Sequence, residues 1–333
     1  MDPLTQGIVG ATLPQATNKN QHTVIAGLLG FFSGLAPDLD VVFRSNTDPL
    51  LFLEYHRQFT HSLVFIPFGG LICAAVFYCL FARRWGLSFR RCWLYCTLGF
   101  ATHGLVDACT TYGTQLLWPV SDMRIAWNTL SIIDPLYTLP LVLLVILSAL
   151  KKNNRYARAA LIWAISYPVL GLIQNERAEQ LGQRLAQQRQ HTPIRLEAKP
   201  SFANLLLWKI VYETEDKFYI DAVRVGSSVN TYQGDSVNKL NLTRDFPWLK
   251  PNTQQAKDIE RFRWFSNGYI AKDPDNPNRI IDMRYSLLPN EVNALWGIEL
   301  NPDAKDSDHV AYVMLRKMSP EHIESFKRML FND

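Results

Sequence analysis

The sequence predicts a mainly α multi-span membrane helical bundle, with four to five spans, followed by a small α+β soluble domain. Residues 22–175 hold nearly all the long apolar runs, whereas 176–333 are polar and charged with short alternating segments. With 333 residues, the chain also exceeds a typical single domain. We therefore expect a membrane helical domain at 1–175, an amphipathic neck at 176–200 and an α+β C-terminal domain at 201–333.

Four apolar runs approach the roughly 20 residues that a helix needs to cross the hydrocarbon of a bilayer. They occupy residues 62–82, 92–109, 132–150 and 156–173. An earlier run at 23–36 is shorter, and Pro37 ends it. This run could be a short span extended by Val41, Val42 and Phe43, or a re-entrant hairpin formed with the apolar segment 8–13. The sequence leaves both alternatives open.

Positive charge is distributed unequally among the loops between these runs. Two loops hold four positive residues each, namely Arg83, Arg84, Arg90 and Arg91 in one and Lys151, Lys152, Arg155 and Arg158 in the other. The opposite loops hold only Arg44, Arg57 and Arg124. Because positive loops stay in the cytoplasm, we expect the C-terminal domain on the opposite, outer face of the membrane.

The polar half changes pattern along its length. A Gln/Arg-rich stretch at 175–190 has apolar residues at helical spacing, which predicts the helical neck. Segments 205–212 and 217–223 then flank a short polar turn and predict a β-hairpin. Further strands are expected at 279–287, 295–300 and 310–317. Ser319 and Pro320 have the residue types of a helix N-cap and first turn, so a last helix should follow them.

Composition excludes several function classes. The formal charge is only +4 and no run rich in Lys and Arg is present, so we expect no direct nucleic-acid binding. All five cysteines lie in or beside the apolar runs, and none form a C-x-x-C pair. This pattern favours small buried side chains over a disulfide scaffold or a thiolate zinc site.

The informative feature is the position of ionisable residues at the ends and starts of the apolar runs. Such groups cost roughly 2.5–3.5 kcal/mol each at the centre of a membrane span on insertion scales, so they indicate function. With the topology above, all of them should meet at one membrane face. The candidate metal ligands are Asp38, Asp40, His56, His61, His103 and Asp107.

Spacing supports this grouping, although each pair also has a structural explanation. His103 and Asp107 are four residues apart and share one helix face, where they could bind a metal or pack against another helix. His56 and His61 would diverge on a continuous helix. They can converge only if His56 lies in a loop and His61 in the first helical turn, with Thr60 as the N-cap.

Carboxylates after the first run do not match the electrostatics of a helix end. Asp38 and Asp40 follow a helix C-terminus, where the helix dipole favours cations. This mismatch favours a bound cation, with a solvated turn as the alternative. Asp134 precedes Pro135 and has the residue type of an N-cap, but it could also serve as a catalytic base. Asp122 is a second candidate base, or a partner of Arg124.

Several stretches resemble the YdjM-type family of bacterial inner-membrane-associated proteins, described as metal-dependent hydrolases. They include Pro37-Asp38-Leu39-Asp40, the H-R-x-F-T-H-S element at 56–62, His103-Gly104-Leu105-Val106-Asp107 and Ile133-Asp134-Pro135, with further likeness in the polar half. The family usually opens with D-P-x-T-H, and this chain has Gln6 at the last position. The resemblance implies an inner-membrane location, hydrolase activity and, in some descriptions, binding to LexA.

The kinds of candidate ligand atom predict which metal binds and which reaction it supports. Imidazoles and carboxylates without thiolates suit a divalent metal, with Zn²⁺ first and Mn²⁺ or Fe²⁺ as alternatives. We expect a membrane-bound metal-dependent hydrolase that cleaves a phosphoester or related ester, which could be a lipid. Asp134 or Asp122 would act as base, and Arg57 would stabilise the developing oxyanion. The alternative is a non-catalytic membrane module for protein interaction, with structural polar pairs.

Overall fold

The computed structural model describes residues 1–18 and 22–331, and the chain divides into two compact units. The first unit comprises Met1–Val42, Tyr55–Ile173 and Phe202–Asn204. The second comprises Phe43–Glu54, Gln174–Ser201 and Leu205–Asp333. The segment Phe43–Glu54, which lies between Asp40 and His56 in the sequence, therefore belongs with the C-terminal unit.

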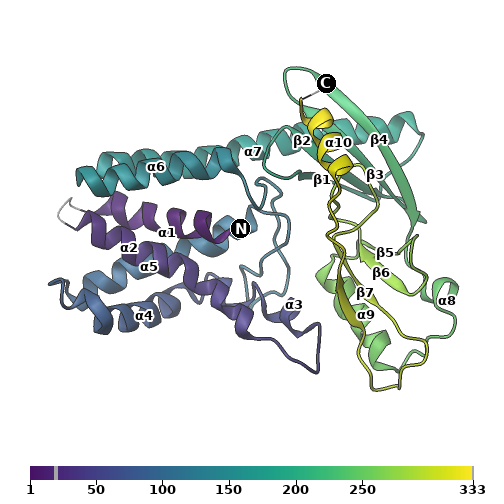
Figure 1. Ribbon diagram of the computed structural model, residues 1–333, viewed down its shortest axis with the longest axis horizontal. Coiled ribbons are helices and arrows are strands. Elements are labelled where there is room, and N and C mark those ends of the chain that lie inside the picture. Colours follow the sequence, from purple (N-terminus) through teal and green to yellow (C-terminus); the bar gives the residue numbers. More distant parts are fainter. Residues whose placement is uncertain (19–21, 332–333) are drawn as a thin grey trace. The chain divides into compact units, whose positions relative to one another are not determined.

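The first unit is a helical bundle (Figure 1). Its long helices are α1 (Pro3–Thr17), α2 (Thr23–Leu35), α4 (Ile66–Phe77), α5 (Phe89–Ala108), α6 (Pro135–Lys151) and the first part of α7 (Asn154–Gln188). Shorter helical pieces extend two of them: the 3₁₀ segment Ala36–Val42 follows α2, and the π-helical segment Tyr78–Ala82 follows α4. Helix α1 packs against α2, α5 and α6, and α4 packs against α5.

Glycines allow the central helices to approach closely. A Cβ atom on Gly30 would lie 2.4 Å from the carbonyl oxygen of Gly10, and one on Gly10 would lie 2.6 Å from the carbonyl oxygen of Gly30. The backbones of α1 and α2 are thus in contact at this crossing, as in other small-residue interfaces between membrane helices. This packing holds the N-terminal end of α1 beside the C-terminal end of α2, where Asp38 follows.

Within the described residues, two helical segments are long and apolar enough to cross a membrane, Thr23–Val42 and Asn154–Gln188. A third span results if the pair Leu51–His61 and Ile66–Ala82, bent by 86°, counts as one. Helix α6 is apolar but shorter. The first run reaches spanning length because the 3₁₀ segment extends α2 through Val42. The expected four to five spans are not reached on this count.

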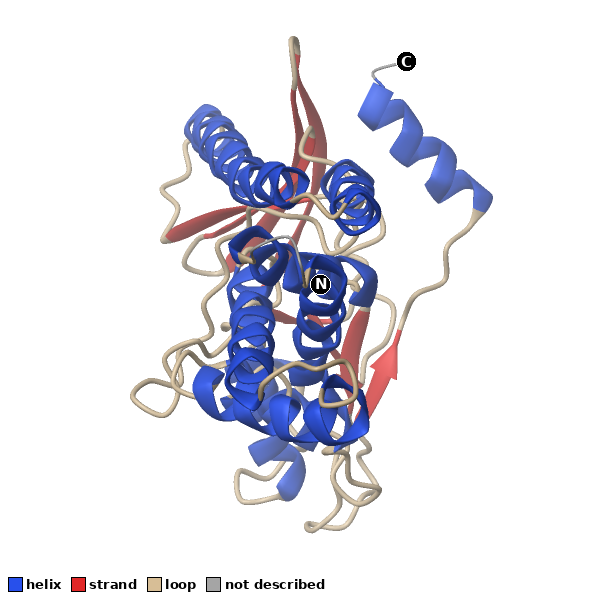
Figure 2. Ribbon diagram, turned by 90° about the vertical axis from the view of Figure 1, so that its left-hand side faces the viewer, coloured by secondary structure: helices blue, strands red, loops and turns tan. Residues whose placement is uncertain are grey.

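The second unit contains two four-stranded antiparallel sheets, whose strands are red in Figure 2. The first has the order β1 (Arg195–Pro200), β2 (Leu207–Glu213), β3 (Lys217–Val225), β4 (Val229–Asn238), and the second the order β5 (Ile270–Lys272), β6 (Arg279–Asp282), β7 (Trp296–Glu299), β8 (Ala311–Met314). The predicted hairpin is confirmed, because β2 and β3 pair antiparallel across the polar turn.

Helices complete the second unit: α8 (Leu242–Asp245), α9 (Gln254–Phe265) and α10 (Pro320–Phe331), together with α3 (Leu51–Tyr55) up to Glu54. Ser319 accepts a hydrogen bond from the backbone N–H of His322, so it caps α10 as predicted. A buried apolar cluster that includes Val211, Phe218 and Ile281 joins residues of both sheets.

The stretch expected to form the neck divides between two elements. Helix α7 continues without a break through Gln188, and strand β1 begins at Arg195. The first sheet therefore begins before residue 201. Strand β1 was hidden in the sequence because charged residues alternate with its apolar ones, although Ala198 is fully buried.

Candidate metal centre

The structure brings together all six residues singled out from the sequence as candidate ligands. They form two groups, each with one donor atom per residue and all donor atoms within 4.8 Å of one another. The first group is Asp38, His61, His103 and Asp107, and the second is Asp38, Asp40 and His56. Asp38 belongs to both, so the groups are adjacent. The residues come from the 3₁₀ segment after α2, the segment before α4, and α5.

His103 offers Nε2 to the first group. Its Nδ1 lies 2.6 Å from the carbonyl oxygen of Gly34, which can only accept a hydrogen bond. Nδ1 must therefore carry the proton, and in the neutral ring Nε2 then has a free lone pair. A backbone carbonyl that fixes the tautomer in this way is typical of histidines that bind metals.

His61 is oriented in the same manner. Its Nδ1 lies 2.9 Å from the hydroxyl oxygen of Thr60, and that hydroxyl donates to Asp40 Oδ2 at 2.9 Å. Since the hydroxyl proton is used for Asp40, the oxygen accepts from Nδ1 of His61. The Nε2 atoms of His61 and His103 then face each other at 3.0 Å. If both rings are neutral, two lone pairs at this distance repel, and either a metal ion beside both or a proton on one Nε2 removes the repulsion.

The two carboxylate oxygens of Asp107 have different surroundings, because Oδ1 accepts hydrogen bonds and Oδ2 faces the two histidines. Its Oδ1 accepts hydrogen bonds from the side-chain amide of Gln6 at 2.7 Å and from the amino group of Met1 at 2.5 Å. Its Oδ2 is fully buried and makes no well-aligned hydrogen bond, although the charged Nε of Arg57 lies 3.1 Å away and Nε2 of His61 lies 3.4 Å away. A metal ion would give this buried oxygen the direct ligand contact that it lacks.

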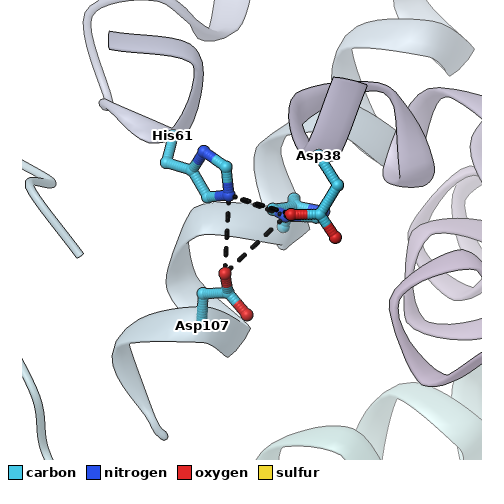
Figure 3. A group of neighbouring side chains, drawn as sticks. Asp38, His61 and Asp107 are labelled. Carbon is cyan, nitrogen blue, oxygen red and sulfur yellow. Dashed lines mark hydrogen bonds and ion pairs between the residues drawn. The ribbon is translucent and has the colours of Figure 1, made fainter. Parts of the chain in front are cut away.

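Figure 3 shows Asp38, His61 and Asp107 pointing toward one another from separate segments. Asp38 Oδ1 lies 3.4 Å from Nε2 of His61 and 3.3 Å from Nε2 of His103. Two ligand atoms on one ion, at the usual bond lengths and about 90–110° apart, are roughly 2.8–3.6 Å from each other. The separations around His61 fall in this range, and the distance between His103 Nε2 and Asp107 Oδ2, at 3.8 Å, is slightly longer. The first group therefore fits a single metal ion.

The second group lies closer to solvent. His56 follows α3 in a turn, with its side chain 32% exposed, and its Nδ1 is 2.7 Å from Asp40 Oδ1. The side chain of Asp38 is 29% exposed, whereas that of Asp40 is fully buried. A second ion here would share Asp38 with the first, which is the arrangement of two-metal hydrolytic sites.

Arg57 connects the two groups. Its backbone N–H donates to Asp40 Oδ2 at 3.1 Å, and its Nε lies 3.1 Å from Asp107 Oδ2. The residue has a φ of 66°, a left-handed conformation that costs a non-glycine residue free energy. The buried guanidinium lies 5.1 Å from the ring centre of Tyr112. Arg57 thus contacts two carboxylates of the groups, Asp40 and Asp107, and the amino group of Met1 adds a second positive charge beside Asp107.

The helix start near His61 differs from expectation. Helix α4 begins at Ile66, with Pro67 in its first turn, and residues 59–61 form a separate 3₁₀ turn. The predicted capping role of Thr60 is wrong, because its hydroxyl donates to Asp40 instead. Proline is favoured in the first turn of a helix, which explains the later start. The break is what allows His56 and His61 to converge.

Neither candidate base belongs to a group of the centre. Asp134 is the N-cap of α6, accepting from the backbone N–H groups of Leu136 and Tyr137, and its other oxygen accepts from the hydroxyl of Tyr167 at 2.9 Å. Its capping role is confirmed. Asp122 is exposed in the loop between α5 and α6. A catalytic role for either residue stays a prediction.

The sequence did not predict the contribution of Gly104, and it did not predict that Gln6 would support a carboxylate. A Cβ atom on Gly104 would lie 2.2 Å from the carbonyl oxygen of His61, so this glycine lets the His61 segment approach α5. Gln6, where the family usually has histidine, supports Asp107 through a hydrogen bond. The position of Gly104 directly after His103 was the available signal.

Comparisons with known proteins agree with a membrane assignment. A model of the family described as "YdjM inner membrane protein" matches residues 1–178. Inner membrane protein YbcI of Escherichia coli K12 is 38% identical over 100 residues, 28% of this chain and 54% of YbcI. The uncharacterized protein YfhP of Bacillus subtilis 168 is 28% identical over 142 residues, 40% of this chain and 42% of YfhP. The chain thus spans about half the length of these relatives, and no solved structure matches it.

Proposed function

The chain belongs to the YdjM inner membrane protein family, and from this premise we propose that it is a membrane-bound, metal-dependent hydrolase of phosphoesters or related esters. The observation that carries the proposal is the pair of Nε2 atoms of His61 and His103, 3.0 Å apart with both Nδ1 protons used elsewhere. Asp38 and Asp107 complete a mixed nitrogen and oxygen donor set. That set suits Zn²⁺ best, with Mn²⁺ or Fe²⁺ as alternatives.

Metal ions held by these residues would supply a water of lowered pKa and a Lewis acid for the scissile group. The protein's own part is orientation and charge. Gly34 and Thr60 fix the tautomers of the two histidines, and Gln6 holds Asp107. The guanidinium of Arg57 lies beside Asp107 and provides positive charge for an anionic oxygen of the substrate.

The substrate class follows from charge and access. Negative charge that develops on a phosphoester suits a site with two cations and an arginine. The more exposed residues of the centre are Asp38 and His56, so we expect the substrate to enter beside the second group. Large apolar side chains such as Leu139 and Ile162 are more than 60% exposed on the helical unit, as expected for a lipid-facing surface. A lipid phosphoester could reach the centre from the bilayer.

A hydrolase assay with metal analysis tests this function. Detergent-purified protein would be assayed with bis(p-nitrophenyl) phosphate and with phosphatidic acid in mixed micelles, after metal removal and after addition of Zn²⁺ or Mn²⁺. Wild type should hydrolyse at least one probe in a metal-dependent way, and His103→Ala should lose that activity. Metal binding without hydrolysis of any ester probe would favour the non-catalytic interaction module.

We propose that the centre lies at the periplasmic face of the inner membrane and that the N-terminal domain crosses this membrane with four to five spans. The dense positive loops support this topology. Single cysteines at Asn46 and Arg84, in a background without the native cysteines, would be labelled in intact cells with a membrane-impermeant maleimide. Asn46→Cys should react and Arg84→Cys should not. The reverse labelling would place the centre on the cytoplasmic face.

A further inference from the structure

We propose that Lys209 and Ser286 form a serine–lysine catalytic pair in the second unit, and that this pair hydrolyses carboxylic esters independently of the metal centre. The Nζ of Lys209, on β2, donates to the hydroxyl oxygen of Ser286 at 2.7 Å. Ser286 follows β6 and is held by a β-bridge to Ala294, which precedes β7. All three residues belong to the second unit, so the pair forms within one compact body.

Lys209 is buried without a carboxylate to stabilise its charge. The residue is 4% exposed, and among the described residues no carboxylate forms an ion pair with its Nζ, whose second acceptor is the backbone carbonyl oxygen of Glu291. Lys199 lies directly opposite on β1 and is buried too, but its Nζ is paired with the carboxylate of Glu197. Like charges directly opposite each other on neighbouring strands destabilise a sheet. The lysine without an ion pair is therefore the one that loses its proton.

Two further carboxyl groups act on Lys209 through space, and both have other partners. Asp282, on β6, forms a buried ion pair with Arg284 at 2.7 Å. The carboxyl group of Glu291 lies 3.9 Å from Nε2 of His322 on α10, and burial raises its pKa. Neither group therefore offers Lys209 a full negative charge at hydrogen-bond distance.

A neutral Lys209 has the geometry of a general base for Ser286. Burial lowers the pKa of Lys209 to about 7, so in neutral to mildly alkaline solution much of the amine has a free lone pair. The hydroxyl of Ser286 donates to the carbonyl oxygen of Leu288 at 2.5 Å, and rotation about its Cβ–Oγ bond turns the proton toward Nζ. The 2.7 Å between Nζ and Oγ is within the roughly 2.6–3.2 Å that proton transfer to a base needs. Serine–lysine pairs serve as nucleophile and base on unrelated folds.

Exposure suits the two roles, because Lys209 is buried whereas Ser286 is only half-buried and can meet a substrate from solvent. The reaction balances without a cofactor. Oγ bonds to the carbonyl carbon of the ester as its proton moves to Nζ, and the ester C–O bond then breaks as the departing alcohol takes that proton. A water molecule next gives a proton to Nζ and attacks the acyl carbon. Nζ returns the proton to Oγ as the carboxylic acid leaves.

Covalent labelling of the full chain in detergent tests the pair, with a biotinylated alkyl fluorophosphonate as the probe and EDTA present throughout to remove bound metal. Attack by Oγ expels fluoride and leaves a phosphonyl group, which peptide mass spectrometry should locate at Ser286. Ser286→Ala should abolish this label. Lys209→Met should slow labelling by at least about 100-fold, the usual contribution of a positioned base. Ser236→Ala, at an exposed serine of β4, should match wild type.

The pH dependence of wild-type labelling covers the case in which a variant disturbs folding. The labelling rate should rise about tenfold from pH 6 to pH 8, as Lys209 loses its proton, and then level off. Hydrolysis of p-nitrophenyl butyrate, measured with EDTA present, should show the same pH dependence and the same losses in Ser286→Ala and Lys209→Met. If wild type carries no label at Ser286, or if wild type and Lys209→Met are labelled at equal rates, the catalytic pair is refuted.

Discussion

The Nε2 atoms of His61 and His103 lie 3.0 Å apart although 42 residues separate them in the sequence. Both rings are buried, so water does not solvate the two Nε2 atoms, and a metal ion or a proton must hold them together. We predict that His61→Ala or His103→Ala lowers the metal content to less than one tenth of wild type, measured by mass spectrometry of the purified protein. His322→Ala, in α10, is the control and should keep its metal. Full metal content in both centre variants would refute the first group.

Gly104 sets the approach of the His61 segment to α5. A methyl group at this position would lie 2.2 Å from the carbonyl oxygen of His61, a distance that real Cβ atoms do not show. Gly104→Ala should therefore displace His61, lower metal content and destabilise the helical unit by about 1–3 kcal/mol, as overpacking does. Leu105→Ala, at an exposed position of the same helix, should change neither metal content nor the thermal midpoint by a comparable amount.

Gln6 donates to the Asp107 oxygen that faces away from His61, so in the proposed centre it would orient this candidate ligand. We expect Gln6→Ala to weaken metal affinity about 10–100-fold because Asp107 loses a supporting hydrogen bond. An imidazole N–H can replace the amide N–H, and Gln6→His should retain wild-type affinity or exceed it. Competition with a zinc-binding dye would measure both. Equal affinities for Gln6→Ala and wild type would show that this hydrogen bond is dispensable.

Substitution of Asp134 distinguishes a structural role of its carboxylate from a catalytic role. Its carboxylate caps α6 and accepts from Tyr167, so Asp134→Ala should cost on the order of 1 kcal/mol or somewhat more of stability. Metal content should remain at the wild-type level, because Asp134 belongs to neither group of the centre. If hydrolysis per bound metal is also unchanged, the predicted base role is refuted. A selective loss of turnover would instead support that role.

The sequence was sufficient to select the candidate ligands and insufficient to show which residues support them. Asp38, His61, His103 and Asp107 stand out because ionisable residues in apolar runs are rare, and that signal needs no coordinates. The break between His61 and α4 was missed because Thr60 and Ser62 have the residue types of a helix start. The hydrogen bond from Gln6 to Asp107 joins residues far apart in the chain, and no local pattern encodes such a pair.

Strand β4 was not predicted, for a related reason. Strands β2 and β3 are rich in aromatic and β-branched residues, which predicted the hairpin. Strand β4 alternates between exposed and half-buried positions and has little apolar character, so it reads as a loop. Its place in the sheet is fixed by pairing with β3, which is tertiary information. Burial of charged residues such as Lys209 is likewise invisible in the sequence.

Lys209 predicts how the stability of the C-terminal domain depends on pH. Its Nζ is buried between Ser286 and the carbonyl oxygen of Glu291, and burial lowers the pKa of Lys209 to about 7. An unfolded lysine has a pKa near 10.4. Between about pH 7 and pH 10 the unfolded chain therefore binds more protons than the folded one, and the free energy of unfolding should rise with pH by up to a few kcal/mol.

The penalty for burying Lys209 is fully present below pH 7 and is relieved as pH increases through this window. Denaturant unfolding of the full chain, followed by the fluorescence of the buried Trp208 and Trp296, should show a rising midpoint from pH 7 to pH 9. Lys209→Met should be more stable than wild type at pH 7, and its denaturation midpoint should depend much less on pH. Lys217→Met, at an exposed position, should retain the wild-type increase of the midpoint with pH. If the midpoints of Lys209→Met and wild type change in parallel with pH, Lys209 stays charged when buried.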